Sequence, residues 1–352
     1  MLPEWIFKPC PEVSESHREA AMARQSQLTK PTGALGRLEQ VAIDLAGLQQ
    51  CDRPGAENAA VIVFAADHGI AAKGVSAYPQ AVTVAMMANF ASGGAAISVL
   101  ARQLGARLEV VDVGTLAQEA MSGVVTDKPR AGTRDFSEEA AMTAEETAFA
   151  LCAGQRAVMR AQAQGVDVVI LGEMGIGNTT SSAAIAASLL GMAASQLVGT
   201  GSGVDARGRA RKARLIDAAQ ARHGIGQDAL PAHILCALGG LEIAAICGAI
   251  IASAQARIPV LIDGFIVSAA ALMATRLNPS CRPYLLASHQ SAEQGHRQVL
   301  QAMDLRPLLS LDLRLGEGSG AAIALPLVRL ACALHNDMAT FGEAAVPDRA
   351  PG

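Results

Sequence analysis

The stretch VDVVILGEMGIGNTTSS, residues 166–182, holds the pattern that decides the fold. Val166–Leu171 is a short apolar run of strand length, and the glycine-rich turn after it leads into an Ala-rich helical stretch that opens on Thr and Ser. A strand that passes through a tight turn into a helix is half of a β-α-β unit. The same order recurs along the chain, which predicts an α/β fold of the doubly wound class with a parallel sheet.

Short apolar runs alternate with longer helical stretches over most of the chain. The content of 51% hydrophobic but only 3% aromatic residues suits helices packed closely on such a sheet. Residues before about Ala56 are predicted to be helical, and residues 116–136, rich in Gly, Thr, Asp and Lys, are predicted to form a long surface excursion. The six predicted strands are Ala60–Ala66, Leu108–Val113, Val166–Leu171, Pro259–Ile262, Tyr284–Ala287 and Leu309–Leu315.

Charge and cysteine content exclude several classes of protein. The formal net charge is −4 with thinly spread basic residues, so the electrostatic footprint of a nucleic-acid binder is missing. The seven cysteines are odd in number, far apart and form no C-x-x-C pair, which speaks against a disulfide framework or a structural zinc site and favours a reducing cytoplasm.

Membrane and export signals are also weak. The N-terminus has no basic region followed by an apolar run, so we expect no signal peptide. The longest apolar run, residues 234–256, is interrupted by Gly239, Gly240, Glu242 and Gly248 and lacks basic flanks. We therefore interpret it as a buried helix, not a membrane span.

Acids, hydroxyls and glycines follow nearly every predicted strand. In an open parallel sheet the carboxyl ends of the strands share one edge, and ligands bind in the crevice there. One such turn alone is ordinary, but its repetition predicts a convergent site. The turns are Asp67-His68-Gly69, Asp112-Val113-Gly114, Glu173-Met174-Gly175, Asp263-Gly264, Ser288-His289 and Gly316-Glu317-Gly318.

Two glycine loops are candidates for binding a phosphate. Residues 172–180 combine glycines, which let a backbone approach an anion, with Thr and Ser where helix N-terminal amides would point. This is neither a Walker A loop nor a G-x-G-x-x-G fingerprint, and a Ser/Thr-capped helix after a tight turn stays an open alternative. Residues 199–203 form the second loop, and the basic run at 207–214 after it is interpreted as a solvated helix face, one member of which could reach a phosphate.

Two histidine-containing motifs are better explained by structural roles than by catalysis or metal binding. His289, Glu293 and His296 are metal-ligand types, but their spacing does not match the zincin pattern and Gly295 interrupts the face, so no metal site is expected. Asp67 and His68 suggest a catalytic dyad, but adjacent strand residues point to opposite sides. A buried structural role is predicted for His68.

Together the motifs resemble the nicotinate-nucleotide:dimethylbenzimidazole phosphoribosyltransferase family. The resemblance implies a Rossmann-like, mostly parallel sheet flanked by helices in a large α/β catalytic domain, residues 56–320. It also implies a smaller helical domain, built from residues 1–55 and 321–352 at the two termini, and a homodimer. The matching segments are KPTGALGRLE from Lys30, FAADHGIAAKGVSAYP from Phe64, NFASGGAAISVLARQLGA from Asn89, GEMGIGNTT from Gly172, GTGSGVD from Gly199, LGGLEIAAICGAI from Leu238 and LDLRLGEGSGAA from Leu311.

The resemblance also implies an activity. In this family the 5-phosphoribosyl group of nicotinate mononucleotide passes to 5,6-dimethylbenzimidazole, giving α-ribazole 5'-phosphate and nicotinate for the nucleotide loop of cobalamin. The leaving group is already a cationic pyridinium, so neither a metal nor another cofactor is expected, and the demand falls on a base that removes the acceptor's N–H proton. Glu317 matches that base, while Glu173 and Asp263 match acids that line the pocket and would stabilise positive charge on the ribose.

Further residues match the binding pocket of the family. A Gln that often stands in related sequences near Val84-Ala85-Met86-Met87 is missing here, so adenine, a plain benzimidazole or a phenol stay open as acceptors. For the phosphate, the matching residues are Gly175, Gly177, Asn178, Thr179, Gly201, Ser202, Lys212 and Ser291. For the aromatic acceptor, they are Ser76, Tyr78, Met86, Met87, Met174 and Leu315, beside Gly316.

Three other interpretations compete with this one. A transferase using phosphoribosyl pyrophosphate is disfavoured because residues 110–115 contain a single acid and lack a Thr-rich loop. A non-catalytic nucleotide-binding protein could share the fold, although the joint presence of Glu317, Glu173 and Asp263 argues against it. A metal-dependent hydrolase using His289 and His296 would be sensitive to chelators. Without the resemblance, an acid between two glycines is more often a turn residue than a catalyst.

Overall fold

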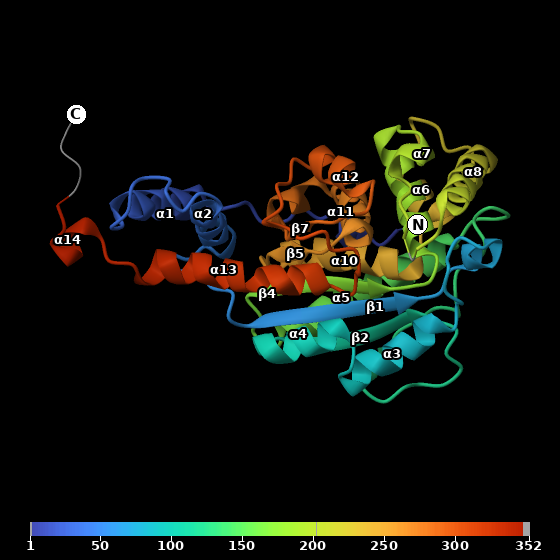
Figure 1. Cartoon of the computed structure of the whole chain (residues 1–352), viewed down its shortest axis with the longest axis horizontal. Helices are drawn as coiled ribbons and strands as arrows, with labels where there is room; N and C mark the ends of the chain where they lie inside the picture. Colours follow the sequence, from blue (N-terminus) through green and yellow to red (C-terminus); the bar gives the residue numbers. More distant parts are fainter. Residues whose placement is uncertain (1, 202, 348–352) are drawn as a thin grey trace.

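A computed structural model describes residues 2–201 and 203–347. A six-stranded, entirely parallel sheet lies at its centre, in the order β3-β2-β1-β4-β5-β6 (Figure 1). The order reverses between β1 and β4, which is the switch point of a doubly wound sheet, and the predicted Rossmann-like α/β class is confirmed. The strands are β1 (Ala59–Ala66), β2 (Arg107–Gly114), β3 (Val124–Thr126), β4 (Val168–Met174), β5 (Val260–Ile262) and β6 (Leu285–Ala287).

Helices cover both faces of the sheet. Neighbouring residues of a strand point to opposite faces and pack into different hydrophobic clusters. Ile62 and Phe64 of β1 pack with α5 (Ala144–Gln162), α10 (Leu241–Gln255) and α11 (Phe265–Leu277). Val61 and Val63 pack with the opposite layer, which consists of α3 (Val82–Ser92), α4 (Ala96–Leu104) and α13 (Ser319–Asp337). Strands buried on both faces explain the nearly continuous apolar runs of the sequence.

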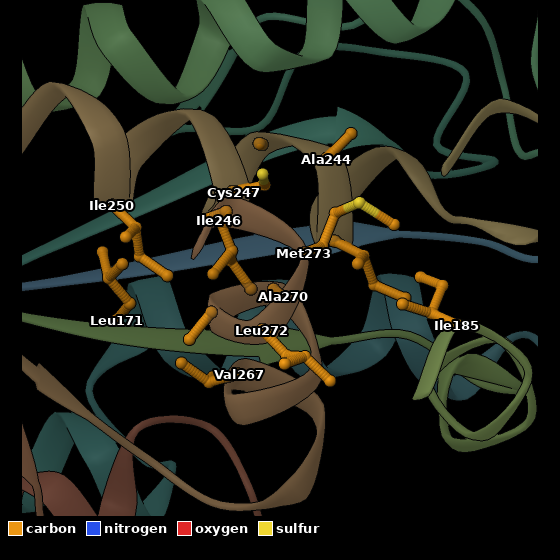
Figure 2. Packing of buried hydrophobic residues seen from close by; sticks show 14 of the residues in the cluster. Leu171, Ile185, Ala244, Ile246, Cys247, Ile250, Val267, Ala270, Leu272 and Met273 are labelled. Atoms are coloured by element: carbon orange, nitrogen blue, oxygen red, sulfur yellow. The ribbon is translucent and has the colours of Figure 1, made fainter. Parts of the chain in front are cut away.

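The predicted burial of residues 234–256 is confirmed. The run forms the end of α9 (Pro231–Leu238) and then α10, with Gly239 and Gly240 in extended conformations between them. Figure 2 shows Ile246 and Ile250 on one side of α10, with Ile250 beside Leu171 of β4. A mostly apolar helix is expected where both of its sides face protein.

Two glycines let α5 and α10 cross at unusually short range. A Cβ atom on Gly154 would lie 1.9 Å from the carbonyl oxygen of Ala245, and one on Gly248 would lie 2.1 Å from that of Leu151. No side chain larger than hydrogen fits at either position without moving a backbone. These two glycines therefore allow α5 and α10 to pack closely against each other.

Residues 82–104 are long and apolar enough to cross a membrane by length and composition alone. They form two helices, however, because α3 ends at Gly93, whose φ is +86°. With 11 residues, α3 is about 16 Å long, roughly half of the apolar thickness of a bilayer. Both helices pack on the sheet through residues such as Phe90 and Ile97.

The strand predicted at Leu309–Leu315 is wrong in extent and place. Only Leu309–Ser310 (β8) is a strand, and it pairs with His289–Gln290 (β7) in a separate two-stranded sheet. The backbone then turns at Asp312, whose φ is +54°, and regular pairing ends. The sixth strand of the main sheet is β3, which lies inside the predicted surface excursion and has only three residues.

Helices from the two ends of the chain, α1 (Glu15–Gln27), α2 (Arg37–Gln49) and α13, come together at one end of the molecule, whereas the first residues of the chain lie beside α10 (Figure 1). The helices α1 and α2 lie beside the second half of α13, and α14 (Phe341–Ala344) follows. Arg24 of α1 donates hydrogen bonds to the carbonyl oxygens of His335, Asn336 and Met338. The remaining helices are η1 (Glu4–Phe7), η2 (Gly69–Lys73), α6 (Asn178–Leu190), α7 (Ala194–Leu197), α8 (Ala206–Arg222), η3 (Pro279–Tyr284) and α12 (His296–Ala302).

Candidate active site

A cavity of about 460 Å³ opens at the carboxyl ends of β4 and β5. It lies at the edge where polar turns were predicted to converge, beside the reversal of strand order. The structure brings fourteen of the predicted site residues into its wall: Tyr78, Met86, Glu173, Met174, Gly175, Gly177, Asn178, Thr179, Gly201, Asp263, Ser291, Leu315, Gly316 and Glu317.

Among the described residues, three other predicted residues are not part of this wall. Met87 is fully buried beneath it, because successive helix residues point about 100° apart and Met86 takes the cavity side. Ser76 lies outside the wall, where its hydroxyl accepts the backbone N–H of Tyr78. Lys212 lies just behind the wall, and Ser202 lies outside the described residues. Met87 and Ser76 therefore do not line the cavity in this structure.

Glu317 lies in a turn of three consecutive residues with left-handed backbone. The φ angles are +88° at Gly316, +65° at Glu317 and +87° at Gly318. Glycine adopts such angles freely, whereas a glutamate rarely does. The turn lies directly on β4, where a Cβ atom on Gly172 would be 2.2 Å from the carbonyl oxygen of Glu317. The side chain of Glu317 is buried against the cavity.

Two other acids hold this turn from opposite sides. The carboxylate of Asp263 accepts the backbone N–H groups of Gly318 at 3.2 Å and Ala321 at 3.0 Å, which are orphan donors at the start of α13. The carboxyl of Glu173 lies against the same turn, where the backbone N–H of Glu317 favours its charged form. A side chain on Gly316 would meet Glu173 Oε1 at 2.3 Å. The conformation of Glu317 is thus determined by contacts on both sides.

Burial shifts the pKa values of all three acids upward. Burial raises the pKa of Glu317, and the nearby charge of Asp263 adds to this, while the backbone N–H of Ile97 offsets it. Burial, with Glu242 and Asp263 close by, raises the pKa of Glu173 to about 8 against the opposing hydrogen bond from Asn178. Burial also raises the pKa of Asp263, which the positive charge of His289 opposes. Clustered acids with raised pKa values are typical of functional sites.

A cationic corner lies behind the first glycine loop. Lys212 is almost fully buried, and its Nζ lies 3.0 Å from the hydroxyl of Thr179. Burial lowers the pKa of Lys212 to about 8, although the charge of Glu293 opposes the shift. A Cβ atom on Gly201 would meet Lys212 Nζ at 2.8 Å, so the second glycine loop closes over the ammonium group. The other basic residues of that run are exposed, as predicted.

Glycines and a helix start surround this corner. Gly177 has φ +101° and is the residue before α6, whose first residue is Asn178. The amide of Asn178 donates to Glu173. Both carboxylate oxygens of Glu293, which lines the cavity, have no hydrogen-bond partner among the described residues. Polar groups of this kind with spare hydrogen-bonding capacity are suited to a polar ligand.

The predicted burial of His68 is confirmed. Its Nε2 lies 2.6 Å from a carboxylate oxygen of Glu242, and its Nδ1 lies 3.1 Å from the hydroxyl of Ser181. A Cβ atom on Gly175 would lie 3.2 Å from Glu242 and 3.3 Å from the imidazole of His68. The pair therefore supports the first glycine loop from behind. Glu242 was not predicted to belong to the site, although it lies in the matching segment from Leu238, because it does not follow a predicted strand.

The histidines of the possible metal motif have other partners. His296 Nδ1 accepts the backbone N–H of Ser291 at 2.8 Å, and its Nε2 lies 2.9 Å from the hydroxyl of Ser268. His289 Nδ1 lies 3.0 Å from the hydroxyl of Ser288 and 3.9 Å from Asp263. Within residues 2–201 and 203–347, no group of three or more potential ligands is arranged to hold a metal.

Several wall residues were not predicted as site residues. Four of them, Phe265, Ile266, Val267 and Ser319, follow a polar turn by one to three positions at the start of a helix, where they look like ordinary core residues. Arg314 is different, because it is an exposed cation two residues before Gly316. The unpredicted wall residues are Val82, Ile176, Gly264, Phe265, Ile266, Val267, His289, Glu293, Leu313, Arg314 and Ser319.

Comparison with known proteins places the chain in a family. A family model described as phosphoribosyltransferase matches residues 10–346. A protein of Bradyrhizobium diazoefficiens named nicotinate-nucleotide--dimethylbenzimidazole phosphoribosyltransferase is 72% identical over 349 residues, which are 99% of each chain. One of the same name from Pseudomonas aeruginosa is 57% identical over 98% of this chain and 99% of its own.

Solved structures agree with these sequence relatives. The crystal structure of nicotinate-nucleotide-dimethylbenzimidazole phosphoribosyltransferase from Thermus thermophilus matches with a TM-score of 0.91 and 44% identity. The match covers 96% of this chain and 100% of the Thermus chain. The fold, the length and the sequence therefore agree from end to end. This chain belongs to the nicotinate-nucleotide--dimethylbenzimidazole phosphoribosyltransferase family.

Proposed function

We propose that this protein transfers the 5-phosphoribosyl group of nicotinate mononucleotide to 5,6-dimethylbenzimidazole, in the synthesis of the cobalamin nucleotide loop. The products are α-ribazole 5'-phosphate and nicotinate. Relatives that match over nearly the whole chain carry the name of this reaction. The observation that carries the proposal is the buried Glu317, whose carboxyl faces a cavity and whose backbone is held by two further acids.

Glu317 is the proposed general base. The acceptor nitrogen attacks C1 of the ribose as the bond from C1 to the pyridinium nitrogen breaks, and nicotinate leaves with the electron pair of that bond. The acceptor ring must then lose its N–H proton, which passes to the carboxylate of Glu317. A raised pKa makes this carboxylate a better proton acceptor than a solvated glutamate.

The other two acids have different proposed tasks. Asp263 holds the turn that carries Glu317, because its oxygens accept two backbone N–H groups there. Glu173, with a pKa of about 8, is largely protonated at neutral pH and is thereby suited to donate a hydrogen bond to the ribose or the leaving group. The negative charge that remains on the cluster opposes the positive charge of the developing oxocarbenium ion.

The phosphate is proposed to bind at the cationic corner. The backbone N–H of Gly177 lies just before α6, where the helix dipole favours an anion. Lys212 supplies a buried positive charge next to Thr179, and the hydroxyl of Ser291 lies on the same wall. A phosphate dianion there would have partners that are already in position.

The aromatic acceptor is proposed to bind among apolar side chains on the opposite wall. Met86 and Met174 give a polarisable surface, and Tyr78 and Leu315 are exposed at the mouth. The α3 helix offers no amide side chain at the wall, since Met86 takes the cavity position. A planar base is therefore selected by shape, and benzimidazole or adenine are the nearest competitors.

Acceptor competition tests the proposed reaction. The protein is incubated with nicotinate mononucleotide, EDTA and equimolar dimethylbenzimidazole, benzimidazole, adenine and phenol, and the ribotides are quantified by mass spectrometry. α-Ribazole 5'-phosphate is expected to dominate, with no effect of EDTA. No ribotide from any acceptor would refute the activity, whereas dominance of adenine or phenol would refute only the acceptor.

We also propose a cytoplasmic homodimer with two domains per chain. The large catalytic domain would comprise residues 56–320, and the small domain would combine residues 1–55 and 321–352. The small domain is supported by the hydrogen bonds of Arg24 to the end of α13. The dimer is supported by the apolar surface of α3 and α4, where residues such as Ala88 and Val99 are exposed. Light scattering would give twice the chain mass for a dimer.

A further inference from the structure

A second cavity, of about 510 Å³, lies away from the candidate active site. Four distant segments form it: the start of α1, helix α2, the η3–β6 segment and residues 304–308. It shares no wall residue with the first cavity. Its polar wall contains four arginines, Arg18, Arg37, Arg282 and Arg306, and we call it the arginine cleft.

The arginine cleft has more positive than negative side chains. Its acids are Asp44 and Asp304, so four arginines and two aspartates leave a net charge of +2. Asp44 is already engaged, because it forms an ion pair with Arg18 at 3.4 Å and accepts a hydrogen bond from Gln40. In the described part of the chain, Arg37, Arg282 and Arg306 have no carboxylate within ion-pair distance.

Backbone carbonyl groups hold two of these arginines in place. Arg37 donates to the carbonyl oxygen of Arg306 at 3.0 Å. Arg282 donates to the carbonyl oxygens of Met303 and Asp304. A guanidinium group has five N–H donors, so each of these side chains keeps donors for a ligand. The groups are thus positioned without being neutralised, and a bound anion would meet them with little reordering.

Two of the four arginines, Arg18 and Arg282, are partly buried. Burial lowers the pKa of Arg282, and the charges of Asp304 and Asp44 only partly oppose the shift. The terminal nitrogens of Arg18 pair with Glu15 and Asp44, whereas its buried Nε has no hydrogen-bond partner among the described residues. An anion in the cleft would therefore find guanidinium donors that are partly removed from water and still available.

The floor of the arginine cleft is apolar. It includes Leu48 and Leu285, which are buried, and the partly exposed Leu286, Leu305 and Leu308. Leu285 and Leu286 belong to β6, the edge strand of the main sheet. A ligand that fills the cleft would therefore place its charge on the arginines and an apolar body on the leucines.

We propose that the arginine cleft binds phosphate monoesters that carry a planar or apolar body, at a site separate from the candidate active site. A phosphate dianion matches the net charge of +2, and guanidinium groups bind phosphate in a bidentate manner and stack on planar rings. Such a ligand would connect α2 to the edge of the sheet. The inference does not depend on the proposed reaction.

Calorimetry with phenyl phosphate and inorganic phosphate tests this inference on the full-length protein. The variant is Arg37→Gln/Arg306→Gln, and the control is Arg297→Gln, an exposed arginine on α12 outside the cleft. Both residues of the double variant lie at the surface, so folding is expected to survive. We expect phenyl phosphate to bind wild type and the control about tenfold more tightly than inorganic phosphate, and its affinity to fall at least tenfold in the double variant.

Steady-state kinetics separates the two cavities. If the lost binding belongs to the arginine cleft, the double variant keeps the wild-type KM for nicotinate mononucleotide. Equal affinity in wild type and double variant, or an equal loss in Arg297→Gln, would overturn the inference. A parallel rise in KM would assign the binding to the catalytic cavity and overturn it as well. Equal affinity for phenyl phosphate and inorganic phosphate would overturn the inference that the ligand carries an apolar body. The calorimetric test does not require the proposed reaction to be correct.

Discussion

At the scale of single residues, the main feature is a glutamate in a conformation that glutamates rarely adopt. A non-glycine residue at φ +65° costs on the order of 1–3 kcal/mol and persists only where its surroundings impose it. Here Gly172 leaves room beneath the turn, Asp263 accepts the N–H of Gly318, and Glu173 lies against Gly316. The strain is thus offset by contacts that also direct the carboxyl into the cavity.

Asp263→Asn tests this positioning role. An amide can accept only through its oxygen, so one of the N–H groups of Gly318 and Ala321 would lose its acceptor and the turn would shift. We expect kcat to fall by about 10²-fold, because a displacement of about 1 Å near the chemistry has that effect. Asp312→Asn, in an exposed turn with φ +54°, is the matched control and should keep kcat. Wild-type kcat in Asp263→Asn would exclude the role.

The pKa of Lys212 predicts a pH dependence of substrate binding. Since burial lowers this pKa to about 8, the ammonium group is charged below pH 8 and its charge is lost as the pH rises through that value. We expect KM for nicotinate mononucleotide to rise above pH 8 in wild type. Lys212→Met should have a high KM at every pH and no such rise, while the exposed Lys8→Met should behave as wild type. A pH-independent wild-type KM would contradict the assignment.

At the scale of elements, glycines determine how closely helices approach. Gly248→Ala would place a methyl group 2.1 Å from the carbonyl oxygen of Leu151, so α5 and α10 must separate. We expect the free energy of unfolding to fall by about 2–3 kcal/mol in urea titrations. Gly226→Ala, which meets no atom within 4 Å, is the control. A change below about 0.5 kcal/mol for Gly248→Ala would mean that the crossing is loose.

The sequence allowed most elements to be predicted, and the exceptions have physical reasons. Five predicted strands lie in the main sheet because their residues are apolar on both faces. The β3 strand was missed because an edge strand of three residues shows no periodicity. Leu309–Leu315 was overpredicted because its apolar residues alternate like those of a strand, although Asp312 breaks the extended backbone. The sequence could not tell which of Met86 and Met87 lines the cavity, because the two neighbours are equally apolar.

At the scale of the whole molecule, the turns after parallel strands predicted the place of the cavity, since those strand ends share one edge.

Contacts between segments without a motif could not be predicted. Glu242 supports the first glycine loop from inside an apolar helix, and Lys212 is buried although its neighbours are exposed. The arginine cleft joins segments from residue 18 to residue 306, and only the fold brings them together. Figure 1 shows the helices of the N-terminal segment beside α13.

The proposed base is tested most directly by Glu317→Gln. The amide keeps the size of the side chain but cannot take a proton, so we expect kcat to fall by at least about 10²-fold with an unchanged melting temperature. Glu119→Gln, which replaces an exposed acid outside the cavity wall, serves as the control for loss of charge. The measurement is the rate of α-ribazole 5'-phosphate formation by the folded variant. We predict that Glu317→Gln loses this rate while Glu119→Gln keeps it. A wild-type rate in Glu317→Gln would contradict the assignment of Glu317 as the base.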